Sequence, residues 1–316
     1  MKITIGTRGS KLALAQTHYI EGLLKEVGVD VEVKIVKTTG DKVQDKKLSE
    51  LGIGVFTKEL DLKMLNNEVD IAVHSLKDVP TVWNENLIIS ATPPRESYHD
   101  LILWKKENEF DIEHDELIVG TSSIRRTEFL SIKYPNLKTK LLRGNVDTRL
   151  RKLREGQYDA IIIAEAGLRR LKIDLSEFNY KKLDILPAPA QGVIGVASRK
   201  DDKEINEILQ KINDKKTYLE ATAERWALRE YGGGCQAPFG ALANYDEESE
   251  VLNLRCELVA EENQTKSFGF CNSSLRSDRH KVVISKEGFV YCSVDKIDFA
   301  KKIGEEVGKA LKRVDE

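Results

Sequence analysis

The chain has 316 residues, of which 41% are hydrophobic and 32% charged, and its formal net charge at pH 7 is −2. This balance is typical of a globular protein and excludes an intrinsically disordered chain. The length is large for one hydrophobic core, so we expect two or three domains. No stretch approaches the roughly 20 apolar residues that a membrane helix needs. The N-terminus does not look like a signal peptide, which indicates a cytoplasmic protein.

The N-terminal part of the chain predicts an α/β unit. A short buried strand at 3–7 precedes a helix that Ser10 can cap, and the alternating segment 31–38 predicts a second, parallel strand. Residues 38–56 contain turn residues and mixed charge without a sustained period. Because long loops inside compact domains are usually functional, we expect a functional loop here, before a helix that begins near Thr57.

A polar cluster closes the next predicted strand. The segment 70–75 is a short apolar run, and HSLKDVP lies at its C-terminal end, where ligands of open α/β sheets collect. Asp78 can therefore act in proton transfer or stabilise a cation, and the alternative is a bend-capping or ion-paired carboxylate. Taken alone, His74 fits a core histidine and Lys77 an ion-pair partner.

The strand and helix pattern restarts near residue 98, which predicts a second α/β domain. Residues 187–199 indicate a hinge followed by a strand that can return to the first domain. Helical stretches at 201–212 and 217–231 come next. The C-terminal part then predicts a small α+β domain, with alternating strands at 240–243, 251–259 and 266–271 and an amphipathic helix from about 297 to 312.

The expected fold is therefore two doubly wound α/β domains of the periplasmic-binding-protein type, joined by a hinge, plus a small C-terminal α+β domain. The first domain is expected to comprise residues 1–95 with 193–212. The second, rich in arginine, is expected at 98–187, and the third at 215–316.

Positive charge is concentrated between Gly120 and Arg154. This segment holds six arginines and four lysines against Glu128 and Asp147, a net charge of +8. The arginines lie at predicted strand ends and helix starts, where backbone N–H groups and the helix dipole already favour anions. We therefore expect an anionic ligand here, and the alternative is a solvated basic helix face.

Two segments, GTRGS at 6–10 and GTSSI at 120–124, each end a predicted strand and start a helix with Thr and Ser donors. Two such helix N-termini facing across a cleft would clamp a polyanion. The planar fork of arginine binds carboxylates bidentately, and intradomain salt bridges are the alternative role. The candidate arginines are Arg8, Arg125, Arg126, Arg143 and Arg149.

The number and spacing of the cysteines and histidines argue against a disulfide framework and a metal site. The four cysteines contain no CxxC pair and are too widely spaced for a disulfide framework, and the five histidines lack ligand spacing, so we expect no metal. Cys256, Cys271 and Cys292 fit small buried hydrophobes. Cys235 follows three glycines in YGGGCQAP, where its thiol is open to attack or attachment, with an inert loop thiol as the alternative.

The chain resembles the porphobilinogen deaminases, also called hydroxymethylbilane synthases. The resemblance covers essentially the whole chain and rests on the order and spacing of TRGSKLALAQ, GDKVQD, AVHSLKDVP, GTSSIRR, LLRGNVDTRL, YDAIIIAEAGLRRL, LPAPAQG, AERWAL and GGGCQAPFGALA. It implies a transferase that joins four porphobilinogen molecules head to tail with loss of ammonia, then releases hydroxymethylbilane by hydrolysis in tetrapyrrole (haem) biosynthesis. It also implies a monomer whose partner is porphobilinogen rather than nucleic acid or a membrane.

By this resemblance, Cys235 carries a covalent dipyrromethane cofactor through a thioether. Asp78 matches the catalytic aspartate, which can stabilise the azafulvene cation left when the aminomethyl nitrogen departs. Phe56 matches the aromatic residue that stacks near the incoming pyrrole. The positions that hold cofactor or substrate, mostly through carboxylates, are Arg8, Ser10, Lys77, Thr121, Ser123, Arg125, Arg126, Arg143, Arg149 and Gln191.

The loop before Phe56 departs from the family pattern. Where the family often has GGKG, this chain has LGIG at 51–54, one residue shorter and without the lysine. No role of that lysine in lid closure or carboxylate binding can therefore be carried over. The lysines that can substitute for it are Lys46, Lys47 and Lys58.

Two other classes of function fit parts of the sequence. A two-domain anion receptor of the periplasmic type shares the hinged layout, but the missing export signal and the third domain with its cysteine argue against it. Ammonia release from porphobilinogen would separate the two. Nucleic-acid binding would use the same basic segment, but only Phe129 and Tyr134 interrupt it with aromatic rings.

Overall fold

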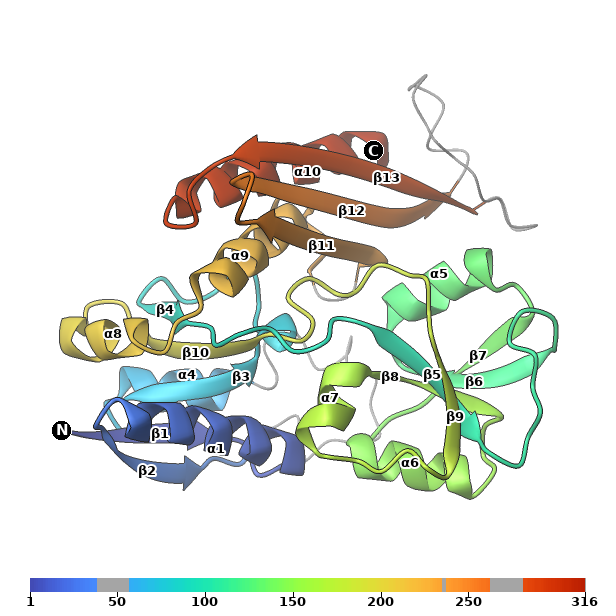
Figure 1. The fold of residues 1–316 in the computed structure, drawn as a ribbon, viewed down its shortest axis with the longest axis horizontal. Helices are drawn as coiled ribbons and strands as arrows, with labels where there is room; N and C mark the ends of the chain where they lie inside the picture. The colour runs from blue at the N-terminus through green and yellow to red at the C-terminus, as the bar shows by residue number, and fades with distance from the viewer. Residues whose placement is uncertain (39–56, 235–236, 262–280, 316) are drawn as a thin grey trace.

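The computed structural model describes residues 1–38, 57–234, 237–261 and 281–315. Three sheets organise these residues, two of five strands and one of three. In Figure 1 the two five-stranded sheets lie at the lower left and lower right, and the three-stranded sheet lies above them. Across the described ranges, no helix combines the length and apolarity that crossing a membrane requires.

The first sheet has the strand order β2-β1-β3-β10-β4. Its strands are β1 (Lys2–Thr7), β2 (Asp30–Ile35), β3 (Ile71–Ser75), β4 (Leu87–Ala91) and β10 (Ile194–Arg199). The predicted parallel pairing of β1 with β2 is confirmed. The strand after the hinge does return to this sheet, where β10 lies between β3 and β4 and is antiparallel to both. β4 was not predicted.

Helices cover both faces of the first sheet. The helices α1 (Lys11–Glu26) and α8 (Lys203–Gln210) pack on the face that includes Ile3. On the opposite face, α4 (Lys58–Leu65) packs with Ala72. Burial on both faces explains why the central strands are almost continuously apolar, and it leaves the strand ends as the place where polar side chains gather.

The second sheet repeats this arrangement, with the order β7-β6-β8-β5-β9. Its strands are β5 (Asp100–Lys105), β6 (Leu117–Thr121), β7 (Leu137–Leu141), β8 (Ala160–Ala164) and β9 (Phe178–Lys182). β6 is parallel to β7 and β8, as β1 is to β2 and β3, whereas β5 is antiparallel to both of its neighbours. The resemblance between segments 6–10 and 120–124 is therefore structural: each connects the corresponding strand, β1 or β6, to a helix.

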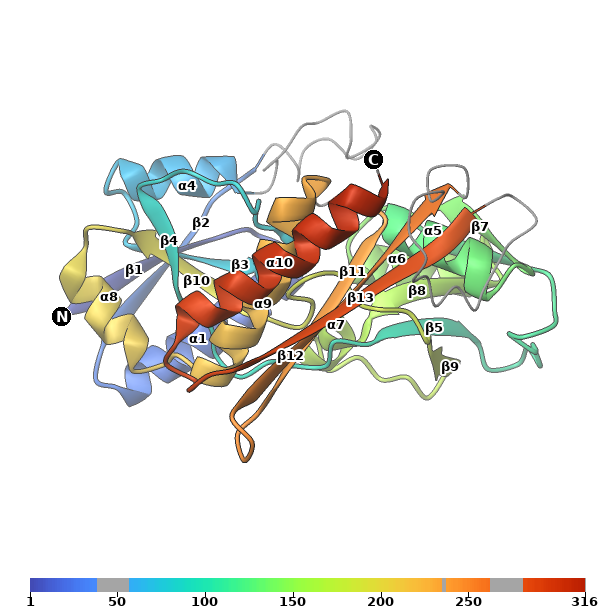
Figure 2. The same ribbon diagram turned by 90° about the horizontal axis from the view of Figure 1, so that it is seen from above.

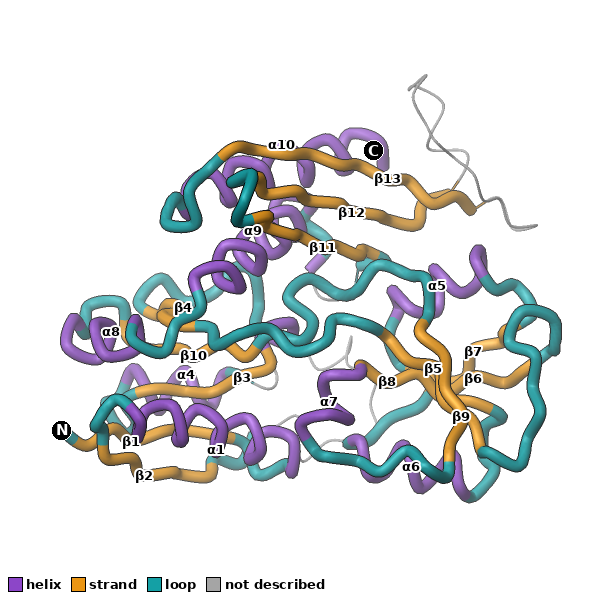
Figure 3. The backbone as a smooth tube through the Cα atoms, viewed as in Figure 1, coloured by secondary structure: helices purple, strands orange, loops and turns teal. Residues whose placement is uncertain are grey.

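The helices of the second sheet also divide between its faces. α5 (Ile124–Lys133) packs on one face, and α6 (Val146–Arg154) and α7 (Glu165–Arg170) pack on the other. The two sheets are joined by two long connections, residues 92–99 and 183–193, drawn as loops in Figure 3. The second of these connections contains the predicted hinge.

The third sheet is antiparallel, in the order β11-β12-β13. Its elements are α9 (Lys215–Tyr231), β11 (Phe239–Asp246), β12 (Val251–Glu261), β13 (Lys281–Tyr291) and α10 (Ile297–Asp315). The strand expected at 266–271 lies outside the described residues, and the third strand of the sheet is β13, further along the chain. The two helices pack on the sheet and against each other (Figure 2). They can approach closely because Gly308 has no side chain: a Cβ there would lie 2.4 Å from the Ala227 carbonyl oxygen.

A buried ion pair joins the first connection to the third sheet. Nη1 of Arg95 donates to Oε1 of Glu224 on α9 at 2.6 Å, and the Glu224 side chain is fully buried. Glu224 also accepts from the backbone N–H groups of Ala190 in the hinge and Ala243 in β11. A buried carboxylate is tolerated when it is paired and fully hydrogen-bonded in this way, so Glu224 fixes the hinge against α9 and β11.

Candidate active site

A short 3₁₀ turn, η1 (Leu76–Asp78), follows β3 and presents two of the predicted site residues. Nζ of Lys77 lies 3.2 Å from Oε1 of Gln191 and donates a hydrogen bond to it. Burial lowers the pKa of Lys77 to about 8, although the neighbouring Asp78 carboxylate opposes the shift. The Asp78 side chain is exposed, and within the described part of the chain no hydrogen bond to it is recorded. Its position therefore follows from the backbone of the turn.

Gln191 connects this turn to the second domain. Its Nε2 donates to the Tyr98 carbonyl at 2.7 Å and to Oδ1 of Asp100 at 2.9 Å. Asp100 is the first residue of β5, and its carboxylate is fully buried. It accepts from Arg125 at 2.6 Å and from Arg126 at 2.7 Å. Burial alone would raise the pKa of Asp100, but the two guanidinium groups hold it well below its usual range.

The N-terminus of α5 places both arginines. The Ser123 side chain caps the helix by accepting from the backbone N–H of Arg126 at 3.4 Å, and Thr121 Oγ1 accepts from the N–H of Ser123 at 3.2 Å. Each guanidinium also donates to a backbone carbonyl: Arg125 to that of Leu186 and Arg126 to that of Ile162. The predicted alternative of intradomain salt bridges thus applies to these two arginines.

A second pair of predicted arginines follows β7: Arg143 lies in the loop before α6, and Arg149 lies within α6. The Asn145 side chain caps α6, and Nε of Arg149 donates to the Gly144 carbonyl at 2.8 Å. Burial, together with the positive charges of Arg126 and Arg143, lowers the pKa of Arg149 to about 10. These three cations are therefore close enough to repel one another, a cost that a bound anion would offset.

The predicted residues of the first domain, Arg8 and Ser10, lie at the end of β1. Ser10 caps α1 by accepting from the backbone N–H of Ala13 at 3.3 Å. Burial lowers the pKa of His74 to about 4, and the charge of the nearby Arg8 adds to the shift. His74 is therefore neutral at pH 7, as its alternative role of core histidine requires.

The two α/β domains meet at the helix N-termini. Nζ of Lys11, the first residue of α1, lies 2.9 Å from the Asp147 carboxylate in the first turn of α6. The prediction that the N-termini of α1 and α5 face each other across a cleft concerns a different pair of helices and stays a prediction.

Arg170 was not predicted as a site residue. It lies at the end of α7, donates to the Gly192 carbonyl in the hinge at 2.7 Å, and has its pKa lowered to about 10 by burial. Its segment directly follows β8, so the rule that drew attention to Asp78, a polar side chain after the carboxyl end of a strand, could have identified it.

Gly234 and Ala237, which flank the predicted attachment cysteine, line the same small cavity of about 50 Å³ as Lys77, Ser123 and Arg125. Cys235 itself, Phe56 and the loop at 40–55 lie outside the described residues. The cavity therefore shows where the chain on either side of Cys235 runs, which is against Lys77 and Arg125. These two residues form a cationic cluster with Arg126, Arg143 and Arg149.

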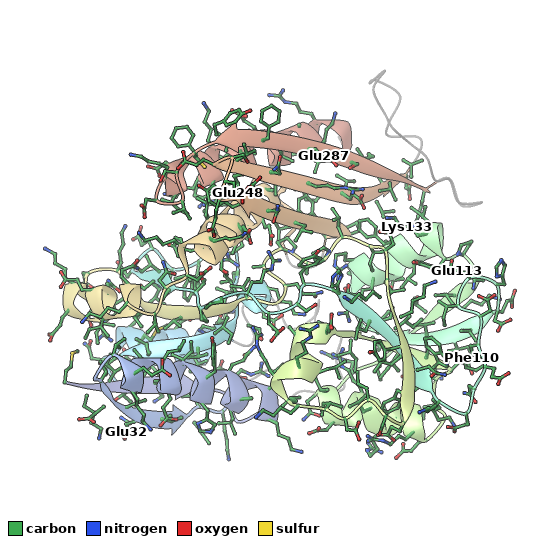
Figure 4. All side chains as sticks on the ribbon, viewed as in Figure 1. Glu32, Phe110, Glu113, Lys133, Glu248 and Glu287 are labelled. Atoms are coloured by element: carbon green, nitrogen blue, oxygen red, sulfur yellow. The ribbon has the colours of Figure 1, made fainter. Side chains whose placement is uncertain are left out.

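The cluster fits a ligand with several carboxylates. Three buried guanidinium nitrogens have no hydrogen-bond partner among the described residues: Nε of Arg125, Nε of Arg126 and Nη1 of Arg143. Buried N–H groups are normally satisfied, and carboxylate oxygens are the acceptors that suit guanidinium groups best. Figure 4 draws the side chains on the ribbon and labels Lys133, the last residue of α5.

Comparisons with known proteins agree on one family. A family model described as the porphobilinogen deaminase dipyromethane cofactor binding domain matches residues 3–207, and one for the C-terminal domain of porphobilinogen deaminase matches 218–272. A probable porphobilinogen deaminase of Methanocaldococcus jannaschii is 56% identical over 310 residues, covering 98% of this chain and 99% of its own. A porphobilinogen deaminase of a Geobacillus species is 44% identical over 258 residues, covering 79% and 82%.

Solved structures give a looser match. The periplasmic VFT2 domain of Bordetella pertussis BvgS is 16% identical with a TM-score of 0.42, covering 67% of this chain and 86% of that domain.

Proposed function

The chain belongs to the porphobilinogen deaminase family and carries the family's dipyrromethane cofactor binding domain, and we propose that it is a transferase with the residue roles set out here. It condenses four porphobilinogen molecules head to tail with loss of ammonia, extending a dipyrromethane held through a thioether at Cys235. It then releases hydroxymethylbilane by hydrolysis. The observation that carries the assignment of residues is the cationic cluster with unsatisfied buried N–H groups, two members of which, Lys77 and Arg125, line a cavity with the neighbours of Cys235.

The arginines bind the carboxylates. Each pyrrole unit carries two carboxylate side chains, and guanidinium groups can hold carboxylates through two parallel hydrogen bonds. Arg126, Arg143 and Arg149 supply cations from the second domain, and the first domain supplies Arg8 and Lys77. Ser10, Thr121 and Ser123, at the N-termini of α1 and α5, lie where N–H groups favour anions. Gln191 fixes Lys77 relative to Asp100.

Asp78 stabilises the positive charge that develops on the substrate. Its carboxylate is exposed, and its negative charge acts to raise the pKa of both Lys77 and Arg149. A carboxylate placed beside the reacting carbon stabilises positive charge on the substrate as the amino group departs, and it can accept the proton that the pyrrole loses. When bound, the dipyrromethane supplies the pyrrole carbon to which the first substrate is added. Phe56 is proposed to stack against the incoming pyrrole.

The mass of the purified chain tests the attachment. The intact protein should exceed the 35.7 kDa of the chain by two linked pyrrole units, and Cys235→Ala should lack this added mass. Cys292→Ala, at a buried cysteine of the third domain, is the matched control and should retain it. A fully active enzyme without added mass would contradict the proposal.

Turnover tests the role of Asp78. Asp78→Asn should keep the fold and the added mass and lose nearly all ammonia release from porphobilinogen, because a neutral amide cannot offset a developing positive charge. Wild-type turnover in this variant would assign the chemistry to another group.

The three-domain division and the monomeric, cytoplasmic state are part of the same proposal. Three separate sheets support the boundaries 1–95 with 193–212, 98–187 and 215–316. The monomeric state is what the resemblance to the family implies. Sedimentation of the active enzyme at working concentration tests this, and a dimer that loses activity on dilution would contradict it.

A further inference from the structure

Arg225 of α9 binds the backbone of the turn that carries the proposed catalytic carboxylate. Its Nη1 donates to the carbonyl oxygens of Leu76 at 3.1 Å and Val79 at 2.8 Å, and its Nη2 donates to that of Pro80 at 2.8 Å. One guanidinium from the third domain thus contacts three carbonyl groups within five consecutive residues of the first domain.

The backbone of the turn makes few other hydrogen bonds. A 3₁₀ helix of three residues has weak internal hydrogen bonding, here including the bond from Val79 N to the Leu76 carbonyl at 3.2 Å. The N–H of Leu76 donates to the Val193 carbonyl at 3.0 Å. Pro80 has no N–H to donate. The C-terminal end of the turn therefore depends on its carbonyl groups for hydrogen bonds, and Arg225 supplies their donors.

Packing holds the turn on one side only. Leu76 and Val79 are buried in a hydrophobic cluster with Val193 and Ala221. A cavity of about 410 Å³ lies between the first and third domains, and its lining includes Leu76, Pro80, Trp83 and Trp226. Arg225 lines both this cavity and the small one that contains Lys77 and Ser123. Close packing on all sides normally holds buried groups in place. Here one side is open, so the hydrogen bonds of Arg225 carry more of that task.

We propose that Arg225 is a positioning residue for the Asp78 carboxylate, acting through the backbone of the turn; the inference rests on the proposed role of Asp78. Among the residues that the structure describes, none hydrogen-bonds to the Asp78 side chain, so its position follows from that of the backbone. A displacement of about 1 Å at a reacting group can cost on the order of 100-fold in rate. Through Arg225, the third domain thus positions the catalytic group of the first domain. The same domain is proposed to carry the cofactor.

The test compares Arg225→Gln with Arg229→Gln in the full chain. Arg229 lies one turn further along α9, lines the same large cavity, and stacks 4.5 Å from the centroid of the Trp226 ring. For Arg225→Gln we expect kcat to fall about 100-fold, with little change in KM because the carboxylate-binding arginines are untouched. Arg229→Gln should remain close to wild type in both constants.

Two further measurements separate positioning from a general loss of structure. Hydrogen exchange of the amides of residues 75–80 should accelerate in Arg225→Gln and not in Arg229→Gln, with exchange in β6 and β8 unchanged. The added mass at Cys235 should persist in both variants. Arg225→Lys keeps the charge but concentrates its donors on one nitrogen, which cannot span three carbonyls as the planar fork does, so it should behave like Arg225→Gln. It also serves as the test variant if Arg225→Gln does not fold.

The outcomes are distinct. Unchanged exchange of the turn, or a kcat near that of wild type in either Arg225 variant, would overturn the inference. If Asp78→Asn is inactive while the Arg225 variants are fully active, only the positioning role fails. If Asp78→Asn is fully active, the proposed function of Asp78 fails, whatever the exchange of the turn shows.

Discussion

The side-chain nitrogen of Gln191 lies 2.9 Å from Oδ1 of Asp100, and this hydrogen bond joins the hinge to the interior of the second sheet. The oxygen of the same amide accepts from Lys77 of the first domain. One neutral side chain thus sets the position of a lysine relative to a carboxylate that two arginines already share. The cations of the two domains are held near one ligand site through Gln191 rather than through direct pairing.

Asp100 should be essential for stability. Asp100→Asn leaves the buried guanidinium groups of Arg125 and Arg126 without their carboxylate, and breaking a buried ion pair in this way costs about 3–5 kcal/mol. Urea unfolding of the purified chain measures the loss. Asp184→Asn is the control, since that side chain is almost fully exposed, and should change the free energy of unfolding by less than about 0.5 kcal/mol. Equal stabilities of the two variants would contradict the assignment.

Lys77 should give carboxylate binding a dependence on pH. Its pKa is lowered to about 8, so the side chain is charged below pH 8 and loses its charge above it. We expect kcat/KM for porphobilinogen to fall as the pH rises through 8, because a neutral amine holds a carboxylate less well. Lys77→Arg should lack this fall, since a guanidinium stays charged. An identical profile in the variant would assign the titration to another group.

Glu220 should make the third domain less stable as the pH rises. Burial raises the pKa of Glu220 to about 7, and the neighbouring Glu224 adds to the shift, whereas the unfolded chain has the ordinary value of 4.5. Between these values the folded state holds a proton that the unfolded state has released, so the free energy of unfolding falls as the pH rises from 4.5 to 7. Relative to wild type, Glu220→Gln should gain up to about 1.4 kcal/mol per pH unit in this window. A constant difference between the two proteins would contradict this.

Two glycines in helices should respond oppositely to alanine. A Cβ at Gly308 of α10 would lie 2.4 Å from the Ala227 carbonyl oxygen, whereas a Cβ at Gly22 of α1 meets nothing within 4 Å. Gly308→Ala should destabilise the chain by about 1–3 kcal/mol through overpacking. Gly22→Ala should stabilise it by about 0.5–1 kcal/mol through helix propensity. Unfolding midpoints measure both, and a neutral Gly308→Ala would show that α9 and α10 can separate at little cost.

Local pattern predicted the elements that have a buried face. The parallel unit of β1 and β2, the start of α4 at Thr57 and the return of β10 all follow from apolar alternation, capping residues and hinge composition. The strand β9 was missed because FNYKK buries only Phe178. An edge strand of this kind is specified by its neighbour β5 rather than by its own alternation.

The sequence predicted which residues form the cationic site better than it predicted the groups that they contact. The position of Arg125 and Arg126 at a helix start indicated an anion. That Asp100 binds both of them could not be predicted, because this contact depends on β5 lying beside β8. Arg225 was missed for a related reason. It donates to backbone carbonyls of a distant segment, and carbonyl acceptors have no signature in side-chain chemistry.

The position of β10 has a consequence for how the chain is made. β10 lies between β3 and β4, yet it follows the entire second α/β domain in the sequence. While the polypeptide emerges from the ribosome, the first sheet cannot reach its native strand order until Arg199 has left the exit tunnel. The strands β5 to β9 are contiguous and can complete their own sheet earlier. The N-terminal domain is therefore synthesised first but completed after the domain inserted within it.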